Sequence, residues 1–109
     1  MAGLSFLSFL NTLNTQEGFS LLIHAEIWVD ILACVEAAEY YVPVSNQETI
    51  VTFGYLGSLK GFKLYTDMFL KDEDQFVPSG CAYLAETDQI RHWMTSKKMD
   101  VNAKPVFNR

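Results

Sequence analysis

Within the stretch Phe19-Ser-Leu-Leu-Ile-His-Ala-Glu-Ile-Trp-Val-Asp-Ile31 the chain changes its hydrophobic period. Residues 19–23 form a short apolar run with the length of one buried strand. From His24 to Tyr40 the apolar side chains recur at helical spacing, and Glu26 stands in the first turn, where a carboxylate favours the helix dipole. The predicted apolar stripe of this helix consists of Ile27, Trp28, Ile31, Leu32, Val35 and Ala38. The stretch therefore predicts a buried strand followed at once by an amphipathic helix.

On the N-terminal side, a second and shorter helix is predicted. Leucines recur every three residues from Leu4 to Leu13, with serine and asparagine between them. Residues 14–18 are typical of the end of a helix, because Gly18 can adopt a left-handed turn conformation.

On the C-terminal side, the pattern changes to strands after Pro43, which ends the helical period. Residues 49–53 are β-branched and aromatic, and residues 81–85 form a run of small apolar side chains. In residues 60–66, Phe62 and Leu64 alternate with Lys63 and Tyr65, which predicts a half-buried strand.

Two later segments complete the prediction. Residues 89–95 are interpreted as a strand, and residues 97–109 as an extended or frayed end. The order of elements predicts a single α+β domain over residues 1–109, with helices packed on a mostly antiparallel sheet.

Three glycines punctuate the middle of the chain. Gly54, Gly57 and Gly61 read G-x-x-G-x-x-x-G, which is neither the dinucleotide-binding pattern nor a P-loop. Tight turns in a bend between strands are the preferred interpretation, and no cofactor is expected.

Charge is distributed unevenly along the 109 residues, whose formal net charge is -5. Lys60 is the first basic residue, and a set of acidic residues precedes it: Glu17, Glu26, Asp30, Glu36, Glu39 and Glu48. One hypothesis is a head-to-tail contact in which the acidic part of one copy meets the basic part of the next. The alternative is an ordinary solvated surface. An acidic chain is repelled by phosphate backbones, so a nucleic-acid partner is not expected.

The residue types that carry chemistry are sparse. Cys34 and Cys81 have apolar neighbours and are predicted to be buried, reduced thiols. His24 is predicted at a helix start and His92 in a strand, without the three or four ligands that a metal site needs. Trp28 and Trp93 are assigned to packing.

Membrane insertion is not expected either. No run approaches the roughly 18 apolar residues of a membrane span. The apolar start of the chain also lacks the positive region of a signal peptide.

Three stretches together resemble the major capsid proteins of tailed phages. They are residues 19–31 quoted above, the run Gly54-Tyr-Leu-Gly-Ser-Leu-Lys-Gly-Phe-Lys-Leu-Tyr-Thr-Asp-Met-Phe-Leu70, and the run Val77-Pro-Ser-Gly-Cys-Ala-Tyr-Leu-Ala85. Their order and spacing over residues 4–95 are similar to the C-terminal part of proteins with the Hong Kong-type capsid fold, shared with encapsulins. Ala25 departs from the proline usual at that position, and the N-terminal arm, extended loop and spine helix of the family are absent from this sequence.

The resemblance implies an axial-domain-like core at residues 19–95, with residues 1–18 and 96–109 as a junction to the peripheral domain or as frayed ends. It implies a viral structural protein of the virion or the host cytoplasm, not an enzyme. Such a protein acts in shell assembly through contacts with itself, as a pentamer, hexamer or shell, or with other capsid subunits. The chain is then a fragment or a shortened form of such a protein.

The predicted contact residues are Gly54, Gly57, Gly61, Asp72, Glu73, Asp74, Lys97 and Lys98. Two alternatives stay open. One is a capsid-like binding module that engages a host or phage protein. The other is a small enzyme that uses Cys34 with His24 or His92.

Overall fold

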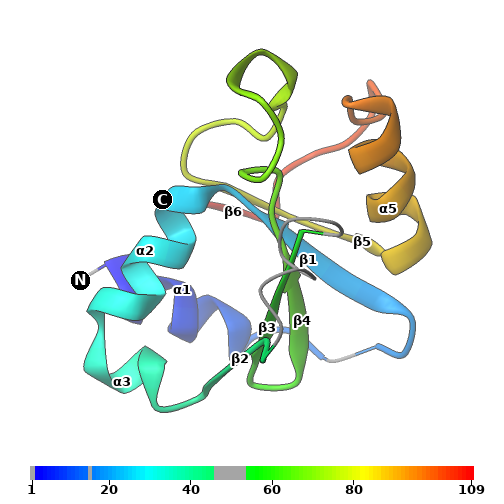
Figure 1. The fold of residues 1–109 in the computed structure, drawn as a ribbon. Coiled ribbons are helices and arrows are strands. Elements are labelled where there is room, and N and C mark those ends of the chain that lie inside the picture. Colours follow the sequence, from blue (N-terminus) through cyan, green and yellow to red (C-terminus); the bar gives the residue numbers. More distant parts are fainter. Residues whose placement is uncertain (1, 15, 46–53) are drawn as a thin grey trace.

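The computed structural model describes residues 2–14, 16–45 and 54–109. Those residues form a six-stranded sheet with the order β2-β3-β4-β1-β5-β6, which confirms the predicted α+β class. Figure 1 shows α1, α2 and α3 on one side of this sheet and α5 on the other. The elements are α1 Ala2–Leu10, β1 Phe19–Ile23, α2 Ala25–Ala33, α3 Val35–Ala38, β2 Tyr41–Pro43, β3 Tyr55–Leu59, β4 Phe62–Tyr65, the 3-10 turn η1 Asp72–Asp74, β5 Cys81–Glu86, α5 Thr87–Ser96 and β6 Phe107–Asn108.

Strand β1 lies in the middle of the sheet and has the predicted bounds. It runs parallel to β4, with Leu21 opposite Leu64, and antiparallel to β5, with Leu21 opposite Leu84. The other strand pairs are antiparallel, so the sheet is mostly antiparallel as predicted. Leu21 and Ile23 point to the cluster under α1–α3, whereas Leu22 points to the cluster under α5, because successive strand side chains alternate between faces.

The two N-terminal helices touch closely. A Cβ atom at Gly3 of α1 would lie 2.5 Å from the carbonyl oxygen of Asp30 and 2.5 Å from Cβ of Cys34. Glycine therefore permits the backbone of α1 to approach α2. Phe6 and Leu10 of α1 are buried in the same cluster.

The predicted continuous helix from His24 to Tyr40 is interrupted. Cys34 has an extended backbone (φ -106°, ψ 114°) between α2 and α3. The buried stripe is Ile27, Ile31, Cys34 and Ala37. The prediction that Leu32 and Val35 belong to this stripe was wrong, because Leu32 lies beyond its edge and the break at Cys34 turns Val35 outward.

Residues 89–95 are helical, so the predicted strand there was wrong. Ile90, Trp93 and Met94 of α5 are buried at positions i, i+3 and i+4, and they cover the second face of the sheet. Their helical spacing, which buries one face of the segment against the sheet, decides its structure. His92 consequently lies exposed on a helix and not in a strand.

The glycine-rich bend is mostly a strand. Gly57 lies inside β3 at a shift of register, and Gly54 directly precedes this strand. The predicted turn is confirmed at Lys60 and Gly61, whose positive φ angles of 51° and 85° join β3 to β4. The predicted strand at 49–53 lies outside the described residues.

Strand β4 follows the predicted alternation only in part. Phe62 and Leu64 are buried and Lys63 is exposed, as expected, but Tyr65 is buried as well. Tyr65 packs in the cluster beneath α5, so both faces of this strand are covered at its end.

Of the two alternatives predicted for residues 97–109, extended or frayed, residues 107–108 are extended, because they form strand β6. Ala82 of β5 lies opposite Phe107 of β6. The ring of Phe107 packs edge-on against Phe6 at 5.0 Å between centroids. Long-range aromatic packing, which residue composition cannot reveal, therefore orders this segment.

Candidate functional site

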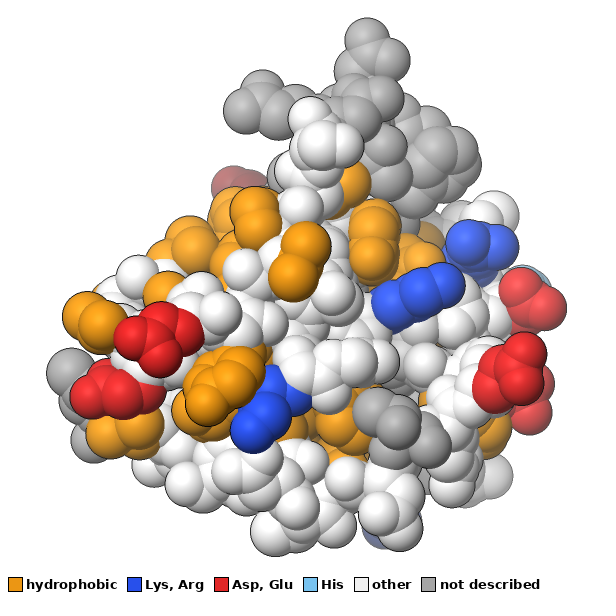
Figure 2. All heavy atoms as spheres, turned by 90° about the horizontal axis from the view of Figure 1, so that it is seen from below, with side chains coloured by type: hydrophobic (Ala, Val, Ile, Leu, Met, Phe, Trp, Pro, Cys, Tyr) orange, Lys and Arg blue, Asp and Glu red, His pale blue; other side chains and the backbone are white. Residues whose placement is uncertain are grey.

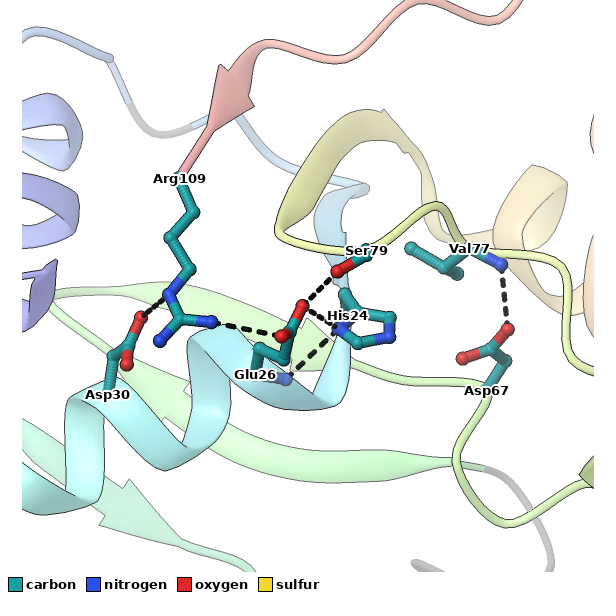
Figure 3. A network of polar contacts seen from close by, with 7 residues as sticks. All are labelled: His24, Glu26, Asp30, Asp67, Val77, Ser79 and Arg109. Atoms are coloured by element: carbon teal, nitrogen blue, oxygen red, sulfur yellow. Dashed lines mark hydrogen bonds and ion pairs between the residues drawn. The ribbon is translucent and has the colours of Figure 1, made fainter.

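A polar network lies where β1 passes into α2. Figure 3 shows that it joins His24 and residues of α2 to Ser79, in the turn before β5, and to Arg109, which follows β6. Three separate parts of the chain therefore meet at the first turns of one helix.

His24 caps α2, as the sequence predicts. Its Nδ1 atom accepts a hydrogen bond from the backbone N–H of Glu26 at 3.1 Å. The same Nδ1 lies 3.1 Å from Oε1 of Glu26. Because one nitrogen cannot accept and donate at once, His24 caps the helix only when Nδ1 carries no proton, and it donates to the carboxylate when Nδ1 carries one.

Glu26 is the centre of the network. The Ser79 hydroxyl donates a hydrogen bond to its Oε1, and the guanidinium of Arg109 lies 3.1 Å from its Oε2. The Ser79 hydrogen bond, with smaller contributions from the charges of His24 and Arg109, holds the pKa of Glu26 below its usual 4.5, although desolvation opposes this. The carboxylate therefore stays ionised at neutral pH.

The network does not form a nucleophile–base pair within the described residues. The Ser79 hydroxyl bonds to Glu26 and not to an imidazole. Cys34 is 1% exposed, and its Sγ lies 3.5 Å from Oε2 of Glu36. A nucleophile needs its base within hydrogen-bond reach, and neither side chain has a histidine there in this structure.

Asp67 is a polar residue that the sequence analysis missed. It is 2% exposed, and its Oδ2 accepts hydrogen bonds from the backbone N–H groups of Phe76 (2.6 Å) and Val77 (2.8 Å). Figure 3 shows the Val77 contact beside the His24 network. The carboxylate fastens the two ends of the loop that carries η1. No local signal separates this aspartate from an exposed one, because its donors follow nine and ten residues later.

The predicted contact residues fall into separate places. Gly54 and Gly57 are buried, whereas Gly61 is exposed at the β3–β4 turn. On the side of the sheet that α5 covers, Lys97 Nζ lies 3.1 Å from Oδ2 of Asp74, so η1 and the end of α5 come together.

The rest of the predicted acidic and basic residues are open to solvent. Asp72 and Glu73 are exposed beside Asp74, and Lys98 is exposed beside Lys97. Neither Asp72 nor Glu73 makes an ion pair within the described part of the chain.

A surface that the sequence analysis did not single out lies on the outer side of α2 and α3. Val29 is 58% exposed, Leu32 51% and Val35 72%. Glu36 and Glu39 of the same region are also exposed. Figure 2 shows acidic side chains set among hydrophobic ones on the side of the molecule where these helices lie. We call Val29, Leu32, Val35, Glu36 and Glu39 the acidic apolar face.

A metal-ligand cluster and a membrane-spanning helix are both absent from the described residues. Among residues 2–14, 16–45 and 54–109, no three histidine, cysteine or acidic side chains gather in a way that could hold a metal ion. None of the helices described has the length and apolar character needed to cross a membrane.

Comparisons with known proteins found no match for this chain among protein-family models, curated proteins or solved structures.

Proposed function

We propose that the chain is a structural module that takes part in capsid or shell assembly through contacts between its own copies. The observation that carries this proposal is the acidic apolar face, where Val29, Leu32 and Val35 are each more than half exposed. Burial of valine and leucine side chains away from water lowers the free energy by about 25 cal/mol per Å² of apolar surface. Clustered outward-facing aliphatic side chains are typical of a surface that binds another protein.

The sequence likeness to phage capsid proteins supports the same function. That likeness includes residues 19–31, which form β1 and the first part of α2. In a module of this kind, packing and charge complementarity do the work, and the His24–Glu26–Arg109 network has a structural role: it fastens the chain end to α2.

The predicted contacts at Gly61, Asp72, Glu73 and Lys98 remain candidates for further interface residues, because all four are exposed. Gly54 and Gly57 contribute in another way. They are buried and set the backbone of the sheet, so they affect contacts only through the shape of β3.

Multi-angle light scattering after gel filtration tests the proposal. Wild-type protein should have a mass above that of a monomer, and Leu32→Ser with Val35→Ser should lower it. Val42→Ser, which removes another exposed valine on edge strand β2, serves as the control and should keep the wild-type mass.

Electron microscopy of any heavy wild-type fraction then distinguishes closed shells from irregular association. A monomer that instead captures a defined host or phage protein would favour the alternative, a capsid-like binding module.

A further inference from the structure

Within the residues that the structure describes, the acidic apolar face has no ion-pair partner. No lysine or arginine of the described residues lies within ion-pair distance of Glu36 or Glu39. Lys60 is engaged elsewhere: its Nζ lies 4.4 Å from the centroid of the Tyr40 ring and donates a hydrogen bond to Asn11. The face therefore presents apolar side chains beside two uncompensated carboxylates.

A second surface has the opposite charge and the same mixture of side chains. We call Lys98, Val101, Lys104 and Val106 the basic apolar segment. Val101 is 99% exposed and Val106 is 38% exposed. Neither Lys98 nor Lys104 forms an ion pair within the described residues, unlike Lys97, which is already paired with Asp74.

The surface of this segment also contains a depression. A depression of about 420 Å³ is lined by Lys98, Met99, Asp100, Val101 and Asn102. Asp100, the one acidic residue in the lining, accepts a hydrogen bond from Gln89 at 2.9 Å. An aliphatic side chain that protrudes from a helix can enter such a depression, and Lys98 in its lining can pair with a carboxylate.

The two surfaces lie far apart on one molecule. Figure 1 shows α3 at the lower left and the start of the segment that follows α5 at the upper right, from where the chain runs back to β6. They cannot meet within a single copy. A contact between two different surfaces of identical chains is heterologous, and its repetition gives a closed ring or an open chain of copies.

We propose that the acidic apolar face of one copy binds the basic apolar segment of the next. The inference rests on the proposed function, and it names the partner surface. Burial of Leu32, Val35 and Val101 supplies the affinity, because the centre of an interface is apolar. The pairing of Glu36 and Glu39 with Lys98 and Lys104 fixes the orientation, since complementary charge selects one register and speeds association.

Exchange of charge tests this pairing directly. The first variant carries Glu36→Lys and Glu39→Lys, and the second carries Lys98→Glu and Lys104→Glu. Each alone has two surfaces of like sign and should sediment as a monomer. Mixed in equal amounts, the two variants present matched surfaces in alternation, and the assembly should return. The substituted sites are all exposed, and circular dichroism verifies that each variant is folded.

A matched control carries Lys63→Glu and Lys71→Glu, which change the charge equally at two exposed sites outside both surfaces. It should assemble like the wild type. Loss of assembly in this control would overturn the pairing, and so would persistence of assembly in either single-surface variant. In both cases an assembling wild type would still support self-association. Failure of the mixture to reassemble would overturn it as well. A wild-type chain that is monomeric throughout would instead remove the proposed function, and the pairing with it.

Discussion

Nε of Arg109 lies 2.8 Å from Oδ2 of Asp30, so the residue after β6 is fastened to the middle of α2. The side chain of Asp30 is only 12% exposed, and the same guanidinium also reaches Glu26. One cation thus neutralises two carboxylates that stand one helical turn apart. This contact holds the edge strand of the sheet against the layer of helices that carries the acidic apolar face.

Replacement of Arg109 by alanine should therefore destabilise the fold modestly. Exposed ion pairs contribute up to about 1 kcal/mol, and the partial burial of Asp30 places this one at the upper end. We expect the free energy of unfolding in urea to fall by about 1 kcal/mol. Lys71→Ala, which removes an exposed lysine outside both proposed surfaces and with no ion pair in the described residues, should change it by less than about 0.5 kcal/mol. Equal losses in the two variants would contradict a role for the Asp30 contact.

The Ser79–Glu26 hydrogen bond predicts a particular response to acid. Because the folded-state pKa of Glu26 is lower than its usual 4.5, its contribution to stability is fully present above that value and is lost as the pH falls through the folded-state pKa. Ser79→Ala should raise the pKa of Glu26 and reduce the loss of stability on acidification.

Nuclear magnetic resonance titration of the Glu26 carboxyl, in wild type and Ser79→Ala, measures this shift. Ser8→Ala on the exposed side of α1 is the control and should leave the titration unchanged. An identical midpoint in the wild type and Ser79→Ala would show that Ser79 does not set the pKa.

Asp67→Ala should be among the most damaging polar substitutions. It leaves the N–H groups of Phe76 and Val77 without their acceptor, in a place where Asp67 and Val77 are buried. Hydrogen bonds to charged groups contribute about 1.5–3 kcal/mol, and unsatisfied buried donors add a penalty. Chemical denaturation should show a loss of about 2–4 kcal/mol. Asp72→Ala in the exposed turn η1 should be close to neutral, and an equal effect of both would contradict the account.

Two glycines with positive φ should differ sharply in their tolerance of alanine. At Gly57 (φ +115°) a Cβ atom would lie 2.1 Å from the carbonyl oxygen of Val42, whereas at Gly18 (φ +82°) it meets nothing within 4 Å. Gly57→Ala adds a backbone clash to the conformational strain and should cost about 2 kcal/mol or more. Gly18→Ala should cost about 1 kcal/mol. Thermal denaturation of the two variants decides this, and a smaller effect at Gly57 than at Gly18 would contradict the geometry of β3.

The parts of the fold that sequence predicted are those with a strong local period. Strand β1, the helix before it and the cap at His24 all follow from neighbouring side chains. Helix α5 was missed because a few apolar residues at helical spacing stand among polar and aromatic ones. The break at Cys34 was missed because α2 and α3 pack in two directions, and no proline or glycine marks the interruption.

The candidate site was less accessible to sequence reasoning. Its histidine was placed correctly at a helix start, but the contacts of Glu26 with Ser79 and Arg109 join residues that are remote in the chain. The acidic apolar face was missed for a related reason: Leu32 and Val35 fit a helical stripe in one dimension, and only the packed structure shows them turned outward.

Sedimentation velocity of the wild-type chain over a wide concentration range tests most directly the claim that this protein assembles with itself. We predict that the weight-average sedimentation coefficient rises with protein concentration and falls again at high salt, since complementary charges fix the contact. A single boundary with the sedimentation coefficient of a monomer at every concentration and salt condition would contradict that claim.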